Sequence, residues 1–301
     1  MSRWSRDDDR GDDNGPQLGR EPAARSHDRI QDRVDDLPMD GLSLPRGEER
    51  EAVELRDRDY TLDGSETRAL ATVGAFRVVV ADDFNPRGQS PDTSNGPWRH
   101  LSEQGLMTRE TLTDRSGARH VMALTREGKA LLDAHRGPRT DGRRQEYYAR
   151  VVKARELSHD AQLYRAYRAE ATRIEREGGR VTRVVLDYEL KRDYQKYLNR
   201  KDRPEAADVR DDRQAFAQAN DLSIIRGHLE LPDLRIEYES EYGRLEHRDV
   251  ELVTEHYSRG QLAGKTKAGF VRYRSGSSGG RGSESRRGGT PHDPRHLERL
   301  Q

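Results

Sequence analysis

The stretch "PDLRIEYESEYGRLEHRDVELVTEHY", residues 232–257, holds two acidic side chains in positions where they could do chemistry. Asp233 opens one alternating segment, and Glu251 lies inside the next. If the two segments are adjacent strands, both carboxylates lie near one end of a sheet and could share a divalent cation such as Mg²⁺ through oxygen ligands. A structural interpretation is also open, in which Asp233 caps a turn after Pro232 and Glu251 lies on a solvated face.

The residues around Glu251 predict which side of the strand it occupies. Alternation places Val250 and Leu252 on one face and Glu251 and Val253 on the other. If the Val250 face packs on helices, the Glu251 face is either an active cleft or an ordinary solvent-exposed surface. Asp187 and Glu189 alternate in "LDYEL" and could serve the same surface.

The elements around these strands indicate an α+β fold. We predict a helix in "SHDAQLYRAYRAEATRIEREGG", capped by Ser158, and a strand in "RVTRVVLDYELKRDY". A polar helical stretch over 203–221, the apolar run "LSIIRG", the two strands of the opening stretch and a final helix over 261–273 follow. The predicted inner face of the first helix consists of Leu163, Tyr167, Ala171 and Ile174.

This order of elements is similar to the core of the restriction-endonuclease-like fold, although other α+β folds fit it too. The resemblance implies Mg²⁺ held by Asp233 and Glu251, and a lysine two residues after the glutamate, near the attacking water. That position is Val253 here. Lys265 or Lys267 on the next helix could supply the positive charge, and Glu170 could serve as an outer carboxylate. The absence of the usual lysine predicts weak or no Mg²⁺-dependent cleavage.

The histidines add little to the case for an enzyme. His159 is interpreted as a helix-start residue, and His247 and His256 flank the glutamate strand without metal-ligand spacing. The sequence also has no phosphate-binding glycine loop between a strand and a helix.

The first half of the chain predicts a winged helix-turn-helix domain. A helix over 63–76 with Asp63 or Ser65 as N-cap, an apolar stretch over 77–84 and a short helix over 96–106 are followed by two alternating segments. The segments "LMTRETLT" and "ARHVMALT" flank the turn "DRSG", which suits a hairpin, and "REGKALLDAHR" is a helix candidate. The turn-rich segment "NPRGQSPDTSNGP" leaves the second helix of the motif indistinct.

The hairpin resembles the wing of MarR-like regulators. The matching positions are Asp114, Arg115, Leu124, Thr125, Glu127 and Gly128. A recognition helix enters the major groove through polar side chains while a basic hairpin tip contacts phosphate. The expected outward residues of the helix are Arg99, Ser102 and Glu103, and those of the wing are Arg115, Arg119 and His120. The alternative is a winged scaffold that contacts proteins and carries solvated arginines.

The arrangement over residues 60–273 resembles the replication-relaxation family of plasmid and mobile-element proteins. The resemblance rests on "SHDAQLYRAYRAE", "LPDLRIEY", "DVELVTEHY" and "KTKAGFVRY". It implies a role with plasmid or transposable DNA during replication, relaxation or transfer.

Composition bounds the remaining predictions. Of 301 residues, 37% are charged and 31% hydrophobic. Part of the chain therefore cannot bury enough apolar surface to offset the conformational entropy lost on folding. We expect disordered tails at 1–57 and 275–301, a winged domain at 58–137, a linker at 138–157 and a nuclease-like domain at 158–274. With no cysteine, no apolar run of membrane-spanning length and no N-terminal apolar signal segment, a cytoplasmic location is expected.

The sequence therefore favours a double-stranded-DNA-binding protein of a mobile element with an inactive or atypical nuclease-like domain. The alternatives are a MarR-like transcriptional regulator and an active Mg²⁺-dependent endonuclease. Expected partners include DNA, a second copy of the chain or other mobile-element proteins, and no membrane. Mg²⁺ is the one cofactor that the residues suggest.

Overall fold

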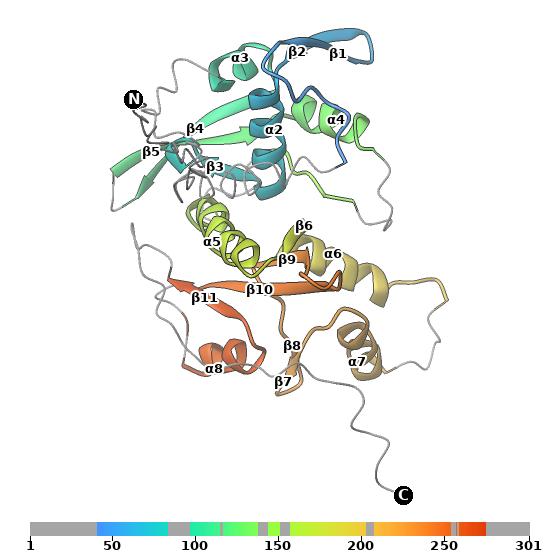
Figure 1. Ribbon diagram of the computed structural model, residues 1–301. Coiled ribbons are helices and arrows are strands. Elements are labelled where there is room, and N and C mark those ends of the chain that lie inside the picture. The colour runs from blue at the N-terminus through green and yellow to red at the C-terminus, as the bar shows by residue number, and fades with distance from the viewer. Residues whose placement is uncertain are drawn as a thin grey trace, which may run out of the picture.

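A computed structural model describes residues 41–83, 97–114, 117–137, 144–150, 157–202, 208–253, 257 and 259–274 of the chain. The fold is mixed α+β, with one set of elements over 41–137, here the N-terminal unit, and another over 157–274, the C-terminal unit. Figure 1 shows α5 (Leu157–Arg176) lying between the two units. None of the described helices is long and apolar enough to cross a membrane.

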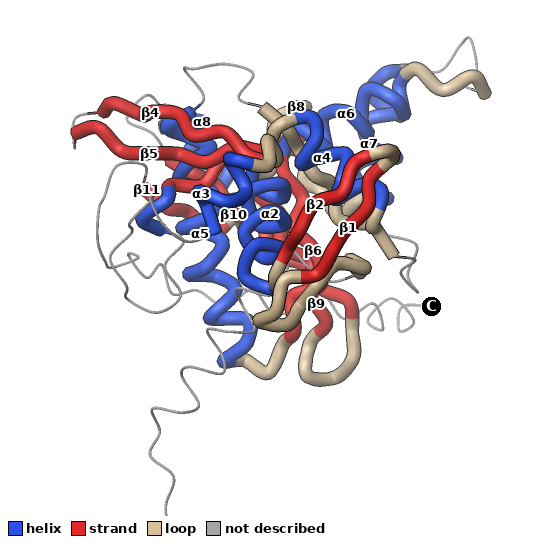
Figure 2. Tube along the Cα trace, turned by 90° about the horizontal axis from the view of Figure 1, so that it is seen from above, coloured by secondary structure: helices blue, strands red, loops and turns tan. Residues whose placement is uncertain are grey.

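The N-terminal unit opens with a hairpin of β1 (Glu51–Leu55) and β2 (Arg58–Leu62), which leads into α2 (Gly64–Phe76). There follow β3 (Val78–Val80), a short 3₁₀ turn (Ala81–Asp83), α3 (Pro97–Glu103), β4 (Met107–Asp114), β5 (Gly117–Leu124) and α4 (Arg126–Ala134). The last three strands form an antiparallel sheet in the order β3-β5-β4. The β4–β5 hairpin reaches out past the helices of its unit (Figure 2).

Several predictions for this unit are confirmed. Asp63 caps α2 by accepting from the backbone N–H groups of Ser65 and Glu66, and the Glu66 carboxylate accepts from the Asp63 N–H. The expected helices after 96 and after 125 and the expected hairpin are present. The expected hairpin tip, Arg115, and the segment 84–96 before α3 lie outside the described residues.

The C-terminal unit places α5 against a four-stranded sheet. Its other elements are β6 (Arg180–Leu186), α6 (Asp187–Leu198), α7 (Val209–Ala219), β7 (Ile224–Ile225), β8 (His228–Leu229), β9 (Leu234–Glu239), β10 (Leu245–Val253), α8 (Arg259–Lys267) and β11 (Val271–Arg274). The sheet order is β11-β10-β9-β6. Neighbouring strands are antiparallel except β10 and β11, which run parallel.

One hydrophobic core runs through both units. The ring of Phe76, at the end of α2, lies 5.2 Å from the Tyr164 ring and 4.9 Å from the Tyr167 ring of α5. The predicted inner face of α5, Leu163, Tyr167, Ala171 and Ile174, is buried throughout. Helix α5 is therefore shared, because its side chains contact the end of α2 as well as its own sheet.

The expected linker and the expected N-terminal tail both contribute to the fold. Gln145 lies in the segment expected to link the domains, yet its amide exchanges two 3.0 Å hydrogen bonds with the backbone of Val184 in β6. Nearby Tyr147 is buried. Residues 41–57 were expected to be disordered, but they include β1 and four buried apolar side chains, Leu42, Leu44, Val53 and Leu55. Residues 1–40 and 275–301 lie outside the described residues.

Two other element boundaries differ from the prediction. The segment 261–273 was expected to be one helix, but α8 ends at Lys267 and Gly269, at φ +84°, turns the chain into β11. Asp187 and Glu189 were expected to alternate on a strand. They instead lie in the first turn of α6, where their side chains do not share a strand face.

Candidate functional site

The structure brings Asp233 and Glu251 to neighbouring strands. Asp233 immediately precedes β9, and the pairing of Leu234 with Val250 sets it beside β10. Its Oδ2 accepts a 2.8 Å hydrogen bond from the backbone N–H of Leu252, the residue after Glu251. The carboxylate of Asp233 thus contacts the neighbouring strand near Glu251.

Glu251 is buried, with 1% of its surface exposed. Its Oε1 accepts a 2.6 Å hydrogen bond from the Tyr257 hydroxyl and lies 3.1 Å from Lys265 Nζ. Its Oε2 is buried and has no hydrogen-bond partner among the described residues. Burial, with the nearby charge of Asp233, raises the pKa of Glu251 above its ordinary value. A solvated position for Glu251 is therefore wrong.

Only one of the two candidate lysines reaches the carboxylates. Lys265 donates a 2.7 Å hydrogen bond to the Leu231 carbonyl, and its Nζ lies 3.5 Å from Glu230 Oε2 as well as near Glu251. Lys267, two residues further along α8, is exposed. Val253, the position where a lysine is usual, is half-buried. The positive group beside Glu251 therefore comes from a helix instead of from the strand.

His159 also belongs to this cluster, although sequence reasoning treated it only as a helix-start residue. Its Nε2 lies 3.3 Å from Asp233 Oδ2, and its Nδ1 lies 3.5 Å from Asp160 Oδ1. Burial lowers the pKa of His159, but hydrogen bonds and charges from Asp160 and Asp233 outweigh it and raise the pKa to about 10. The only sequence signal was the His-Asp pair at the start of the helix.

The donors in this cluster are arranged in the same way around both carboxylates. Asp233 receives the Leu252 backbone N–H and His159 on Oδ2, and Glu251 receives Tyr257 and Lys265 on Oε1. Each carboxylate thus takes these donors on one of its two oxygens. We call these residues, Asp233, Glu251, Lys265 and His159, the carboxylate site.

The donor set suits a hard cation that keeps much of its water shell. Mg²⁺ is commonly bound by one or two carboxylates with water and substrate phosphate completing its shell. The described residues contain no group of three or more His, Cys, Asp or Glu side chains arranged to hold a metal. A closed site made only of protein ligands, as structural zinc requires, is therefore absent from the described part of the chain.

The remaining acidic candidates lie in other contacts. Glu170 accepts a 2.5 Å hydrogen bond from the Tyr273 hydroxyl and pairs with Arg173 and Arg248 at 2.9 and 3.2 Å. Asp187 pairs with Lys191, and Glu189 with Arg183. His247 lies 3.8 Å from Asp249, and its pKa is lowered by burial and by Arg235. His256 lies outside the described residues.

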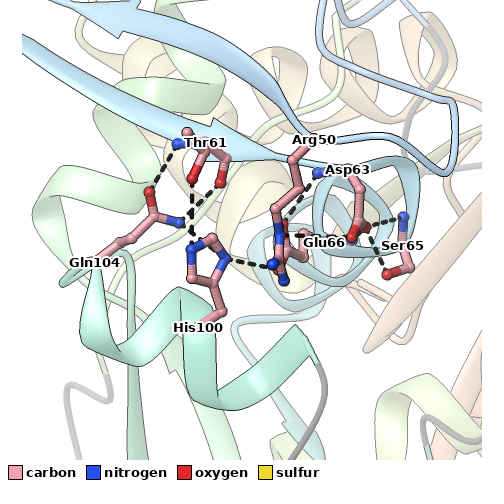
Figure 3. A network of polar contacts seen from close by, with 7 residues as sticks. All are labelled: Arg50, Thr61, Asp63, Ser65, Glu66, His100 and Gln104. Atoms are coloured by element: carbon pink, nitrogen blue, oxygen red, sulfur yellow. Dashed lines mark hydrogen bonds and ion pairs between the residues drawn. The ribbon is translucent and has the colours of Figure 1, made fainter.

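A second polar cluster fixes helix α3 to the rest of its unit (Figure 3). His100 Nδ1 and Arg50 Nη2 each lie 2.7 Å from Oε1 of the fully buried Glu66. Gln104 makes two hydrogen bonds to the backbone of Thr61 in β2, at 2.8 and 3.0 Å. The inner side of α3 is therefore held by both α2 and the β1–β2 hairpin.

The outer side of α3 is polar and solvent-facing. Arg99, Ser102 and Glu103 are all exposed, as predicted, and Arg99 Nε lies 2.7 Å from Glu103 Oε1. On the β4–β5 hairpin, Arg119 of β5 is half-buried and His120 is exposed. The contact residues expected on α3 thus share one accessible surface.

Comparisons of the chain with protein-family models, with curated proteins and with solved structures found no match in any of the three.

Proposed function

We propose that this protein binds duplex DNA through its N-terminal unit and hydrolyses a phosphodiester bond at the carboxylate site with the help of Mg²⁺. One observation carries the proposal. Asp233, Glu251 and Lys265 come from three separate elements and meet at the end of two adjacent strands. Bound there, Mg²⁺ would polarise the phosphate and lower the pKa of an attacking water.

The buried Glu251 Oε2 supports a cation at this place. A buried carboxylate oxygen without a partner costs free energy unless it binds a proton or a cation. The second carboxylate lies next to it and raises its pKa, which a cation between them would reverse. Asp233 and Glu251 are the residues that would hold it.

Lys265 changes the expectation of weak cleavage. That expectation followed from Val253, which offers no charge where a lysine usually stands. Lys265 Nζ lies 3.1 Å from Glu251 Oε1 and supplies the missing charge from α8. A fixed ammonium in a half-buried site can stabilise negative charge that develops on the phosphate. We therefore propose an active site instead of an inactive one.

The topology supports a restriction-endonuclease-like core. The elements follow the order α5, β6, β9, β10, α8, β11. Their four strands form a sheet with two antiparallel strand pairs and one parallel strand pair. Asp233 at the start of the second of these strands and Glu251 in the third are the positions that this fold uses for metal ligands. The helices α6 and α7 and the β7–β8 hairpin are insertions between the first and second strands.

The N-terminal unit supports the DNA-binding half of the proposal. Its β3-β5-β4 sheet, with α3 directly before the β4–β5 hairpin, is consistent with the element order of a winged helix. The exposed Arg99 and Ser102 would face the major groove, with Arg119 near adjacent phosphates. With the resemblance to replication-relaxation proteins, this favours the DNA of a plasmid or other mobile element as substrate.

Nicking of supercoiled plasmid DNA tests the proposal. The full chain should convert supercoiled plasmid to open circles in Mg²⁺ and not in EDTA. Asp233→Ala and Glu251→Ala should each abolish nicking while leaving plasmid binding in place. Glu241→Ala, which removes an exposed carboxylate from the β9–β10 turn, is the matched control and should nick normally. Nicking that survives loss of both site carboxylates would overturn the proposal, as would no nicking by the unaltered chain.

A further inference from the structure

The carboxylate of Asp233 is held by two donors on the same oxygen. The Leu252 N–H lies 2.8 Å from Oδ2, and His159 Nε2 lies 3.3 Å from the same atom. One donor belongs to the neighbouring strand and the other to a helix. Two donors from separate elements fix the rotation of a carboxylate better than one, which leaves Oδ1 as the oxygen presented to a cation.

The contact from His159 continues into the N-terminal unit. Its Nδ1 faces Asp160 Oδ1 at 3.5 Å, and Asp160 Oδ2 lies 2.6 Å from Arg77 Nη1. The side chains of Arg77 and Asp160 are only 4% and 6% exposed, so this ion pair is sheltered from solvent. The Arg77 guanidinium also lies 4.0 Å above the Tyr188 ring of α6.

Arg77 itself belongs to the end of α2. It is the C-cap residue of that helix and has a φ of +67°, a region that few residues other than glycine adopt. The series of contacts therefore runs from the end of α2 in the N-terminal unit, through α5, to the start of β9. Each step is a contact between named polar atoms within 3.5 Å.

We infer that His159 is a positioning residue for Asp233, and that Arg77 and Asp160 hold His159 in place, so that the N-terminal unit forms part of the carboxylate site. The inference rests on the proposed function, because it assumes that Asp233 binds a cation. It goes further because it assigns a role to His159 and because residues of both units then contribute to one site. His159 acts through Asp233, and no contact with substrate is required of it.

Binding of Mn²⁺, measured by isothermal titration calorimetry on the full chain, tests this role without any assay of cleavage. His159→Leu should weaken Mn²⁺ binding ~10-fold or more, the usual effect of losing a partner that orients a metal ligand. His159→Gln keeps an N–H donor of similar reach and should stay within about threefold of the unaltered chain. A merely structural role would lower the melting temperature of both variants and leave the affinity of the folded protein unchanged.

A second variant tests the connection between the units. Arg77→Met combined with Asp160→Leu replaces a buried ion pair by apolar side chains, a change that proteins often tolerate. It should weaken Mn²⁺ binding, though less than His159→Leu does, with duplex-DNA affinity unchanged. Unaltered Mn²⁺ binding in this double variant would overturn the role assigned to Arg77 and Asp160. Unaltered or tighter Mn²⁺ binding in His159→Leu, or equal losses in His159→Leu and His159→Gln, would overturn the inference. Failure of the unaltered chain to bind Mn²⁺ would instead overturn the proposed function.

Discussion

Glu66 and Glu251 are both buried glutamates held in polar clusters, one in each unit of the molecule. Glu66 receives Arg50 and His100 on Oε1 and the Asp63 N–H on Oε2 at 3.0 Å, so both of its oxygens are satisfied within the fold (Figure 3). Glu251 receives two donors on Oε1, whereas its Oε2 has no partner among the described residues. All hydrogen-bonding oxygens of the first carboxylate are thus satisfied by the protein, whereas the second leaves one buried oxygen without a partner in the described part of the chain.

Glu189 shows that an unpartnered oxygen is not sufficient to indicate a site. Its Oε1 pairs with Arg183, and its Oε2 is buried without a partner in the described part of the chain. Burial outweighs the attraction of Arg183 and raises the pKa of Glu189 to about 7. Such a group can relieve its burial by binding a proton. What distinguishes Glu251 is the second carboxylate and the two cationic side chains that converge on the same place.

The largest expected difference concerns stability. Glu66→Ala removes the carboxylate partner of Arg50 and His100 and should reduce the free energy of unfolding by about 3 kcal/mol. Glu251→Gln removes a charge that burial and Asp233 disfavour, and it should change the free energy of unfolding by less than about 1 kcal/mol. Urea unfolding of the full chain measures both. Equal destabilisation by the two substitutions would remove the distinction between a structural and a functional carboxylate.

The next expected effect separates the two lysines of α8. Lys265→Met should lower the rate constant of plasmid nicking ~10²-fold, because it removes the one lysine that contacts Glu251 among the described residues. Lys267→Met, on the same helix but exposed, should remain within about twofold of the unaltered rate. Single-turnover nicking at saturating Mg²⁺ measures the rate constant. The assignment of Lys265 fails if the two variants behave alike.

A smaller effect is expected at the outer side of α3. Arg99→Ala should reduce discrimination between DNA sequences by ~1–3 kcal/mol if the side chain reads guanine. Arg244→Ala changes an arginine on the β9–β10 turn that is also exposed; it is the matched control and should leave sequence choice unchanged. Competition binding with a randomised duplex library at fixed salt gives the preference of each variant. An unchanged preference in Arg99→Ala would exclude that residue from base recognition.

The smallest expected effect is the pH dependence contributed by Glu189. Its pKa is about 7 in the folded chain and ordinarily 4.5, so between these values the folded state binds a proton that the unfolded state releases. Its contribution to stability is therefore full below pH ~4.5 and is lost as the pH rises from there through ~7. Glu189→Gln should remove this slope in thermal unfolding between pH 5 and about pH 7.5. An unchanged slope in Glu189→Gln would contradict a raised pKa of Glu189 in the fold.

Much of the fold could be predicted from the sequence, because local patterns determine it. The Asp63 capping box, the buried stripe of α5 and the β4–β5 hairpin follow from residue spacing alone. The carboxylate pair could also be proposed, since Asp233 and Glu251 lie on segments with clear alternation. These features depend on neighbours close in sequence.

The parts that could not be predicted depend on contacts between distant segments. Lys265 and Lys267 have the same side chain, and only the packing of α8 against β10 decides which one faces Glu251. His159 lies 74 positions before Asp233 in the sequence, and it contacts Asp233 because α5 starts beside β9. Gln145 stands in a polar stretch with no periodicity, and its pairing with Val184 depends on the free edge of β6.

The most direct test of the central claim is to locate a cation in crystals of the full chain grown with Mn²⁺. An anomalous difference map recorded at the manganese absorption edge would show where the ion binds. The structure predicts one strong peak bound by both Asp233 and Glu251, and no peak at Glu66 or Glu189. A map with no peak at the Asp233–Glu251 pair, from protein crystallised in millimolar Mn²⁺, would contradict the claim that this pair is a cation site.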